Sequence, residues 1–283
     1  MVAVRTIQRI TKTMQMIATA KFTASLARSR ATRPYTDRIR TLVAQVAAAA
    51  GEVDSPLLNA KGASGREIVV VISSDRGLCG TYNSNSLRAA HRLIKERQAA
   101  GKQVEVFAAG KKGLSYFRFA KISVAETVDI GDKPSFEQVQ ELAQRLMDQF
   151  TAGTADAVHV VYTRFISNSR QVAEPMQLLP LSMPAGAGDG AGEKVAATAV
   201  YEFSPDAATL VNELLPRAVK VSLFQAFNDS IVSENVMRMV AMKAATDNAS
   251  GLGRTLKRDF NRARQARITT ELTEIVSGAA ALE

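Results

Sequence analysis

Cysteine is almost absent from this sequence of 283 residues, with Cys79 as its only copy. No internal disulfide bond can form, and the usual cysteine spacings of structural zinc sites cannot be built, so a reducing compartment is expected. No run of about 18 apolar residues occurs, so we expect no transmembrane helix. If the protein meets a membrane, we expect it to do so peripherally, through partners.

Residues suited to catalysis are also scarce. The only histidines are His91, in a helix-like stretch, and His159, in a strand-like one, and neither has a partner at the spacing of a metal site or a catalytic pair. Cys79 has no basic neighbour other than Arg76, which leaves it a weak nucleophile. No carboxylate pair stands at a spacing that indicates acid–base catalysis. We predict no catalytic residue, no metal and no cofactor.

The glycine motifs that bind phosphate are missing as well. Neither G-x-G-x-x-G nor G-x-x-x-x-G-K-[ST] occurs. The loop Ser73–Gly80 (SSDRGLCG) does follow the first expected strand, which is where α/β sheets bind ligands. Without the glycine spacing we predict a structural turn there, with Gly77 and Gly80 at unusual backbone angles, in preference to a nucleotide site.

Acidic residues are scarce near the N-terminus. Residues 1–49 contain nine Lys or Arg against one acid, residues 217–283 contain ten against seven, and the middle has 17 against 19. The net charges are therefore +8, +3 and −2 within a total of +9. Basic segments suit nucleic acid, an acidic protein surface or anionic lipid, and charge alone does not choose among them.

The first of three parts, residues 1–50, is predicted to be one helix. Its start is rich in Arg and Thr and lacks acids, as transit peptides do, but the helical pattern continues without a break, so we take it as mature protein. Pro34 is expected to kink or locally break the helix. Apolar residues at alternating steps of four and three predict one narrow seam. These residues are Ala3, Ile7, Ile10, Met14 and Ile17.

The middle, residues 51–216, alternates β-rich and helix-like stretches. This alternation predicts an α/β, Rossmann-like domain with a mostly parallel sheet. The glycine- and alanine-rich stretch between Met183 and Lys194 is expected to be a surface loop, followed by an edge strand over Val195–Phe203. The expected strands are Glu67–Ser73, Gln103–Ala109 and Asp156–Thr163, and the expected helices include Asn83–Ala99 and Ser135–Phe150.

The last part, residues 217–283, contains no proline after Pro216 and is predicted to be one helix of roughly 100 Å. It carries a second narrow seam, which we expect to pair with the first as a long antiparallel coiled coil projecting from the domain. The alternative is that both helices fold back against the sheet; narrow seams with polar or small remaining faces disfavour it. The second seam is Ile268, Leu272, Ile275, Ala279 and Leu282.

A basic row on the last helix supports a rival function, a coiled-coil protein that binds nucleic acid. Only Phe260 could stack on bases there, and acidic residues such as Asp259 interrupt the charge, so a charged coiled-coil face explains the row better. A Rossmann nucleotide enzyme is a more distant alternative. The row consists of Arg254, Lys257, Arg258, Arg262, Arg264 and Arg267.

Four blocks resemble the gamma subunits of F-type ATP synthases. They are Arg9–Phe22 (RITKTMQMIATAKF), Ser74–Gly80 (SDRGLCG), Ser233–Ser250 (SENVMRMVAMKAATDNAS) and Asn261–Leu282 (NRARQARITTELTEIVSGAAAL). They occur in the family's order and at its separations, so the similarity spans nearly the whole chain.

This resemblance implies a role in which the chain is not itself catalytic. In the family the two terminal helices enter a hexamer of three alpha and three beta subunits, and the domain lies against epsilon and the membrane ring of c subunits. Proton flow turns the ring and the shaft, which drives the beta subunits through states of different nucleotide affinity. The implied location is the cytoplasmic face of the bacterial inner membrane, reached through partners and without nucleic acid.

The resemblance also implies contact residues. Positions matching the family's contacts with beta are Lys12, Met14 and Lys21 on the first helix and Arg264, Gln265 and Glu271 on the last; Tyr201 and Glu202 match positions near the c ring or epsilon. Two features depart from the family. The chain begins inside the usual start of bacterial relatives, and Arg267 stands where relatives carry a small residue.

Overall fold

A computed structural model describes residues 2–50, 55–59, 64–181 and 207–280. Within them a five-stranded sheet has the order β3-β2-β1-β4-β5, in which only the β4–β5 pair is antiparallel. The fold class predicted from the sequence is therefore confirmed. The strands are β1 (Arg66–Ile72), β2 (Gln103–Ala109), β3 (Val124–Val128), β4 (Ala157–Ser167) and β5 (Arg170–Leu179).

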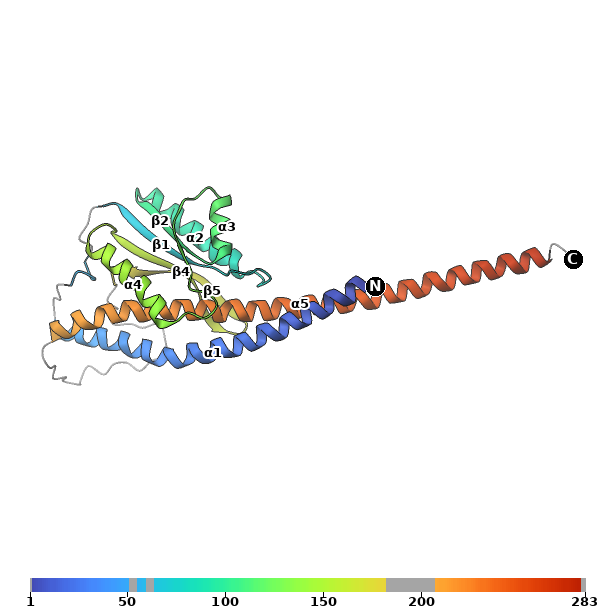
Figure 1. Cartoon of the computed structure of the whole chain (residues 1–283), viewed down its shortest axis with the longest axis horizontal. Coiled ribbons are helices and arrows are strands. Elements are labelled where there is room, and N and C mark those ends of the chain that lie inside the picture. Colours follow the sequence, from blue (N-terminus) through green and yellow to red (C-terminus); the bar gives the residue numbers. More distant parts are fainter. Residues whose placement is uncertain (1, 51–54, 60–63, 182–206, 281–283) are drawn as a thin grey trace.

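The sheet is covered on both faces (Figure 1). Val69 and Val71 of β1 point to the face packed by α2 (Tyr82–Ala99) and α3 (Lys111–Phe119). Val70, between them, points to the other face, which is packed by α4 (Phe136–Thr151) and the last helix, α5. A strand buried on both faces has the continuous apolar run seen in β1. The expected strand Val195–Phe203 lies outside the described residues.

Two long helices form the shaft. Helix α1 spans Val2–Ala50 without ending at Pro34, and α5 spans Ala207–Ala280, so that Pro216 lies inside α5 and not before it. At 74 residues α5 is roughly 110 Å long. The helices run antiparallel, since Thr32 bonds to Gln225 near the domain and Thr11 bonds to Thr246 further out.

The line of α1 that faces α5 is not the predicted seam. The buried and half-buried residues of α1 recur at alternating steps of four and three. This line is displaced by one position from the predicted seam, and it extends toward the N-terminus as far as Thr11. Ile7, Ile10 and Ile17 are instead about half exposed, at 53%, 52% and 53%. The facing line is Ala18, Phe22, Ser25, Ser29, Thr32, Thr36, Ile39, Val43 and Val46. The small and hydroxyl side chains of this line let the two helices approach closely. The prediction considered apolar residues alone, and therefore selected the wrong face of α1.

The predicted pairing of the two seams is also wrong. Val4 of α1 lies beside Gly253, and α5 continues past the start of α1 without a partner helix (Figure 1). From Arg262 to Gly278 every side chain described is exposed, including Ile268, Leu272 and Ile275. Ala279 and Leu282 lie outside the described side chains. We call residues 262–278 the free end of α5.

A polar cluster lies between the two shaft helices next to the domain. Asp229, only 4% exposed, accepts hydrogen bonds from Ser29 Oγ at 3.1 Å and Gln225 Nε2 at 2.7 Å. Burial raises the pKa of Asp229, and the bond from Gln225 and the charge of Arg33 oppose this only in part. Because these groups are satisfied in one alignment of the helices, the cluster fixes their register.

Replacement of Asp229 tests this cluster through pH. A carboxyl group whose folded pKa is raised destabilises the fold as pH rises above its unfolded value of about 3.9. Asp229→Asn stays neutral and keeps an oxygen acceptor, so the difference in melting temperature, variant minus wild type, should become more positive between about pH 4.5 and pH 7.5. Asp229→Ala leaves two donors unsatisfied and should lose about 1–3 kcal/mol in unfolding free energy. Parallel pH curves for wild type and Asp229→Asn would contradict a raised pKa of Asp229 in the fold.

Candidate functional site

The free end of α5 is exposed along its whole length and extends past the start of α1 without a partner helix (Figure 1). Three predicted contact residues lie on it: Arg264 and Gln265 are exposed, and Glu271 accepts a 2.8 Å bond from Arg267 one helical turn away. Where the free end begins, mostly basic side chains line one hollow on the helix surface. Its lining is Arg254, Lys257, Arg258, Asn261, Arg262 and Gln265.

The predicted contacts on α1 lie further toward the domain. Lys12 is exposed, Met14 is half-buried, and Lys21 is engaged within the chain. The structure thus brings Lys12 and Met14 to the shaft surface but does not bring them beside Arg264, because α1 begins opposite residues before the free end. Tyr201 and Glu202 lie outside the described residues.

The loop Ser73–Gly80 connects the sheet to the shaft. Ser74 and Asn83 hold it from inside: Ser74 N–H donates to Asn83 Oδ1 at 3.0 Å, and Asn83 Nδ2 donates to Ser74 Oγ at 2.7 Å. Gly80 has φ +58°, as expected, and lies beside Ala241 and the backbone of Met237 on α5. The prediction of a second unusual backbone angle at Gly77 is wrong. Leu78 has φ +63°, and Gly77 is not in the left-handed region.

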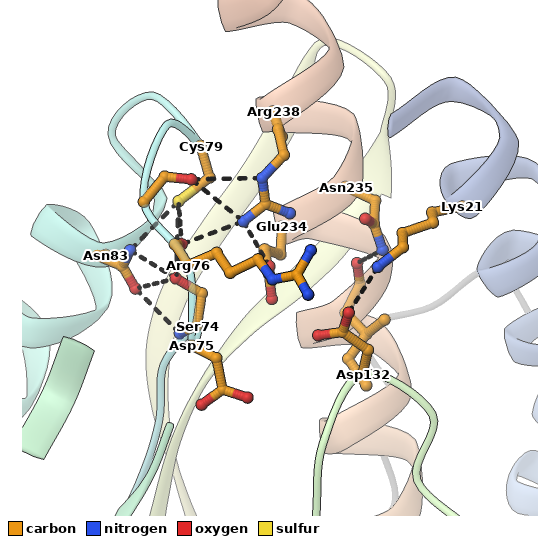
Figure 2. A network of polar contacts seen from close by, with 12 residues as sticks. Lys21, Ser74, Asp75, Arg76, Cys79, Asn83, Asp132, Glu234, Asn235 and Arg238 are labelled. Carbon is orange, nitrogen blue, oxygen red and sulfur yellow. Dashed lines mark hydrogen bonds and ion pairs between the residues drawn. The ribbon is translucent and has the colours of Figure 1, made fainter. Parts of the chain in front are cut away.

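One arginine ties this loop to α5 (Figure 2). Arg238 donates to the backbone oxygen of Arg76 at 3.1 Å and to that of Gly77 at 3.4 Å. It also pairs with Glu234 at 2.7 Å, and both side chains are nearly buried, at 11% and 10% exposure. Burial raises the pKa of Glu234 and Arg238 opposes the shift. The hydrogen bonds from Arg238 therefore clamp the loop to α5, and Glu234 on the same helix holds the guanidinium in place.

A second connection ties α1 to the domain (Figure 2). Lys21 Nζ lies 2.6 Å from Asp132 Oδ2, in the loop between β3 and α4, and the two side chains are 41% and 42% exposed. The hydrogen bond from Lys21 lowers the pKa of Asp132. With Arg238, this pair joins the domain to both helices of the shaft at the same level.

The edge of the sheet where a nucleotide would bind is filled by the chain itself. Asp75 Oδ1 accepts from the backbone N–H of Lys111, at the N-terminus of α3, so a carboxylate already occupies a place suited to phosphate. Gly110 packs so closely that an added Cβ would lie 2.3 Å from Ser73 O. The cavity that remains is about 30 Å³, room for a single water molecule and far below a ligand pocket.

His159 and Cys79 occupy structural positions. His159 is buried, with Nε2 3.4 Å from Glu67 Oε2, and burial lowers its pKa. Burial would raise the pKa of Glu67, but two hydrogen bonds from Arg97 leave it lowered. Cys79 is 2% exposed. Among the described residues no three potential ligands cluster around a metal position, and none of the described helices is long and apolar enough to cross a membrane.

Sequence comparisons agree with this architecture. A family model described as ATP synthase matches residues 1–282. The ATP synthase gamma chain of Rhodopirellula baltica is 38% identical over 283 residues, and that of Janthinobacterium sp. (strain Marseille) is 41% identical. Each comparison covers 99% of this chain and 96% of the relative.

Solved structures share the fold at low sequence identity. A chain of the Euglena gracilis mitochondrial ATP synthase (OSCP/F1/c-ring) has a TM-score of 0.63 at 20% identity, covering 99% of this chain and 91% of that one. A chain of the Tetrahymena thermophila mitochondrial ATP synthase (central stalk/c-ring) has a TM-score of 0.59 at 22% identity, covering 84% and 99%.

The clamp between α5 and the loop is tested by Arg238→Met. This change leaves Glu234 buried without its cation and two carbonyl groups without their donor, so we expect the unfolding free energy to fall by about 3 kcal/mol. Urea unfolding followed by circular dichroism measures it. Arg267→Met is the matched control, because that arginine is 83% exposed, and should change stability by less than about 0.5 kcal/mol. Equal effects of the two variants would refute the clamp.

Proposed function

The chain belongs to the ATP synthase gamma family, and we propose that it is the rotating central-stalk subunit of a proton-translocating ATP synthase. In this role the shaft lies inside a hexamer of three alpha and three beta subunits, and the domain lies against epsilon and the c ring. The chain carries no catalytic site of its own; it couples rotation of the ring to the nucleotide sites of its partners.

The observation that carries this proposal is the free end of α5. It presents Ile268, Leu272 and Ile275 on one face, with no described part of the chain to cover them. Apolar residues on an unpaired helix indicate a partner that surrounds it. A collar of other subunits satisfies this requirement, and it explains why residues at the N-terminal end of α1, such as Ile7 and Ile10, are also exposed.

Charge complements shape in this proposal. Residues 254–278 carry six Lys or Arg against three acids, all on a single helix. An acidic partner surface would attract this helix, but torque requires that the attraction change with angle. The free end carries Ile268, Leu272 and Ile275 on one face only, so its surface is not the same at every angle. The positions we propose for contact with beta are Lys12, Met14, Lys21, Arg264, Gln265 and Glu271.

Torque must pass from the domain to the shaft without slippage. The Lys21–Asp132 ion pair and the hydrogen bonds from Arg238 to the loop Ser73–Gly80 lie at this junction, and the cluster around Asp229 holds the two helices in register. Moving one charge across 100 mV releases about 2.3 kcal/mol, so several charges must contribute to each nucleotide made. A shaft that stores this energy needs several connections, none of which carries the load alone.

At the other end, we propose that Tyr201 and Glu202 lie near the c ring or epsilon, which places the chain peripherally at the cytoplasmic face of the bacterial inner membrane. Nucleic-acid binding, the rival function, is not supported by the relatives named above. The basic row on α5 then serves protein contacts.

Reconstitution with bacterial alpha and beta subunits tests the proposal. We expect a complex with one copy of this chain per three beta subunits, whose ATP hydrolysis depends on it. Ile268→Asp combined with Leu272→Asp should reduce assembly or turnover at least about tenfold, because it places charge on the apolar face that the partner subunits would cover. No association of the wild-type chain would refute the proposal.

The matched control places the same two charges on the opposite face of the free end, as Thr270→Asp with Thr273→Asp. Neither pair touches another described part of the chain, so both variants should melt like wild type. Loss of turnover in both variants would indicate charge repulsion alone and would contradict a specific apolar contact.

A further inference from the structure

A basic groove lies on the domain, on the face of the sheet opposite the shaft. It runs between α2 and α3, which Figure 1 shows on the side of the sheet away from α1 and α5. The groove has a volume of about 670 Å³. Among the described residues that line it, none is acidic, although the middle part of the chain has a net charge of −2. This concentration of positive charge is not explained by the fold.

Most of the basic side chains of the groove form a row along α2. Arg88, Arg92 and Lys95 are exposed at steps of four and three on α2, so they share a face and extend for roughly 10 Å along the helix. Lys112 of α3 lies on the other side of the groove. None of these four residues forms an ion pair among the described residues, so their charge is available to a partner.

The floor of the groove is apolar and aromatic. Leu87 is 6% exposed, and the half-buried rings of His91 and Tyr116 meet edge to face, with Tyr116 Oη 3.3 Å from His91 Nδ1. A site for inorganic phosphate gathers donors around one point. Here the cations form a line along the rim, and the apolar surface lies between the two helices.

We propose that this groove docks an acidic amphipathic segment of a partner polypeptide. An amphipathic helix presents acids at steps of four and three beside an apolar stripe, which matches the rim of Arg88, Arg92 and Lys95 and the floor of Leu87 and Tyr116. The groove is far from the free end of α5, so a partner can occupy it while the shaft is engaged (Figure 1).

The test uses the full chain and a labelled synthetic helical peptide with glutamates at i, i+4 and i+7 beside leucines, followed by fluorescence anisotropy. The triple variant Arg88→Glu, Arg92→Glu, Lys95→Glu should bind it about tenfold or more weakly. A peptide with the leucines replaced by serines should also bind more weakly. Absence of binding to the wild-type chain would overturn the proposal.

The matched control makes the same change of charge elsewhere on the domain, as Lys121→Glu, Lys133→Glu, Arg170→Glu, all at exposed positions outside the groove. It should bind like wild type, and circular dichroism should show both triple variants folded. Equal weakening in the two triple variants would mean only long-range attraction and would overturn the proposal. So would equal binding of the serine peptide, or tight binding of tripolyphosphate that displaces the leucine peptide, since each would assign the groove to simple anions.

Discussion

The structure depends on one continuous helix, α5, being shared by the domain and the shaft. Between Ala226 and Val236 this helix is buried on every side, with the sheet on one face and α1 on the other, and beyond Gly253 it extends alone. A helix enclosed in this way cannot rotate relative to the domain without breaking its packing. When the domain turns, the free end must therefore turn with it, and the shaft needs no hinge or separate coupling element.

Polar side chains hold the buried part of α5 in place, which is unusual for a buried helix. Asp229 bonds to α1, whereas Ser230 and Ser233 bond to the backbone of Thr163 on β4. Apolar contacts tolerate sliding and rotation better than hydrogen bonds do, because a hydrogen bond is lost when its donor moves away from its acceptor. The polar belt thus specifies the register and the angle of α5, and apolar packing supplies most of the burial.

Much of the fold follows from sequence periodicity, and the failures have physical causes. The three predicted β-rich runs and the first long helix are found within a few residues of their expected positions, but α5 begins ten residues before its expected start, at Ala207, with Pro216 in its third turn. Strands β3 and β5 were not predicted. In β5, Pro175 marks an edge position and weakens the pattern. The side of α1 that faces α5 was missed because that line is rich in Ser, Thr and Ala. Which residues contact partner subunits remains a prediction, since it depends on surfaces outside this chain.

Rotation is the most direct measurement of the proposed role. Cys79 is buried and is the only cysteine, so Cys79→Ser with Arg118→Cys gives one exposed thiol on the domain for attachment of a probe. In an immobilised complex with alpha and beta subunits, single-molecule tracking during ATP hydrolysis should show the probe turning in one direction, with three repeats per revolution. Hydrolysis that depends on this chain while the probe stays at a fixed angle would contradict a rotating shaft.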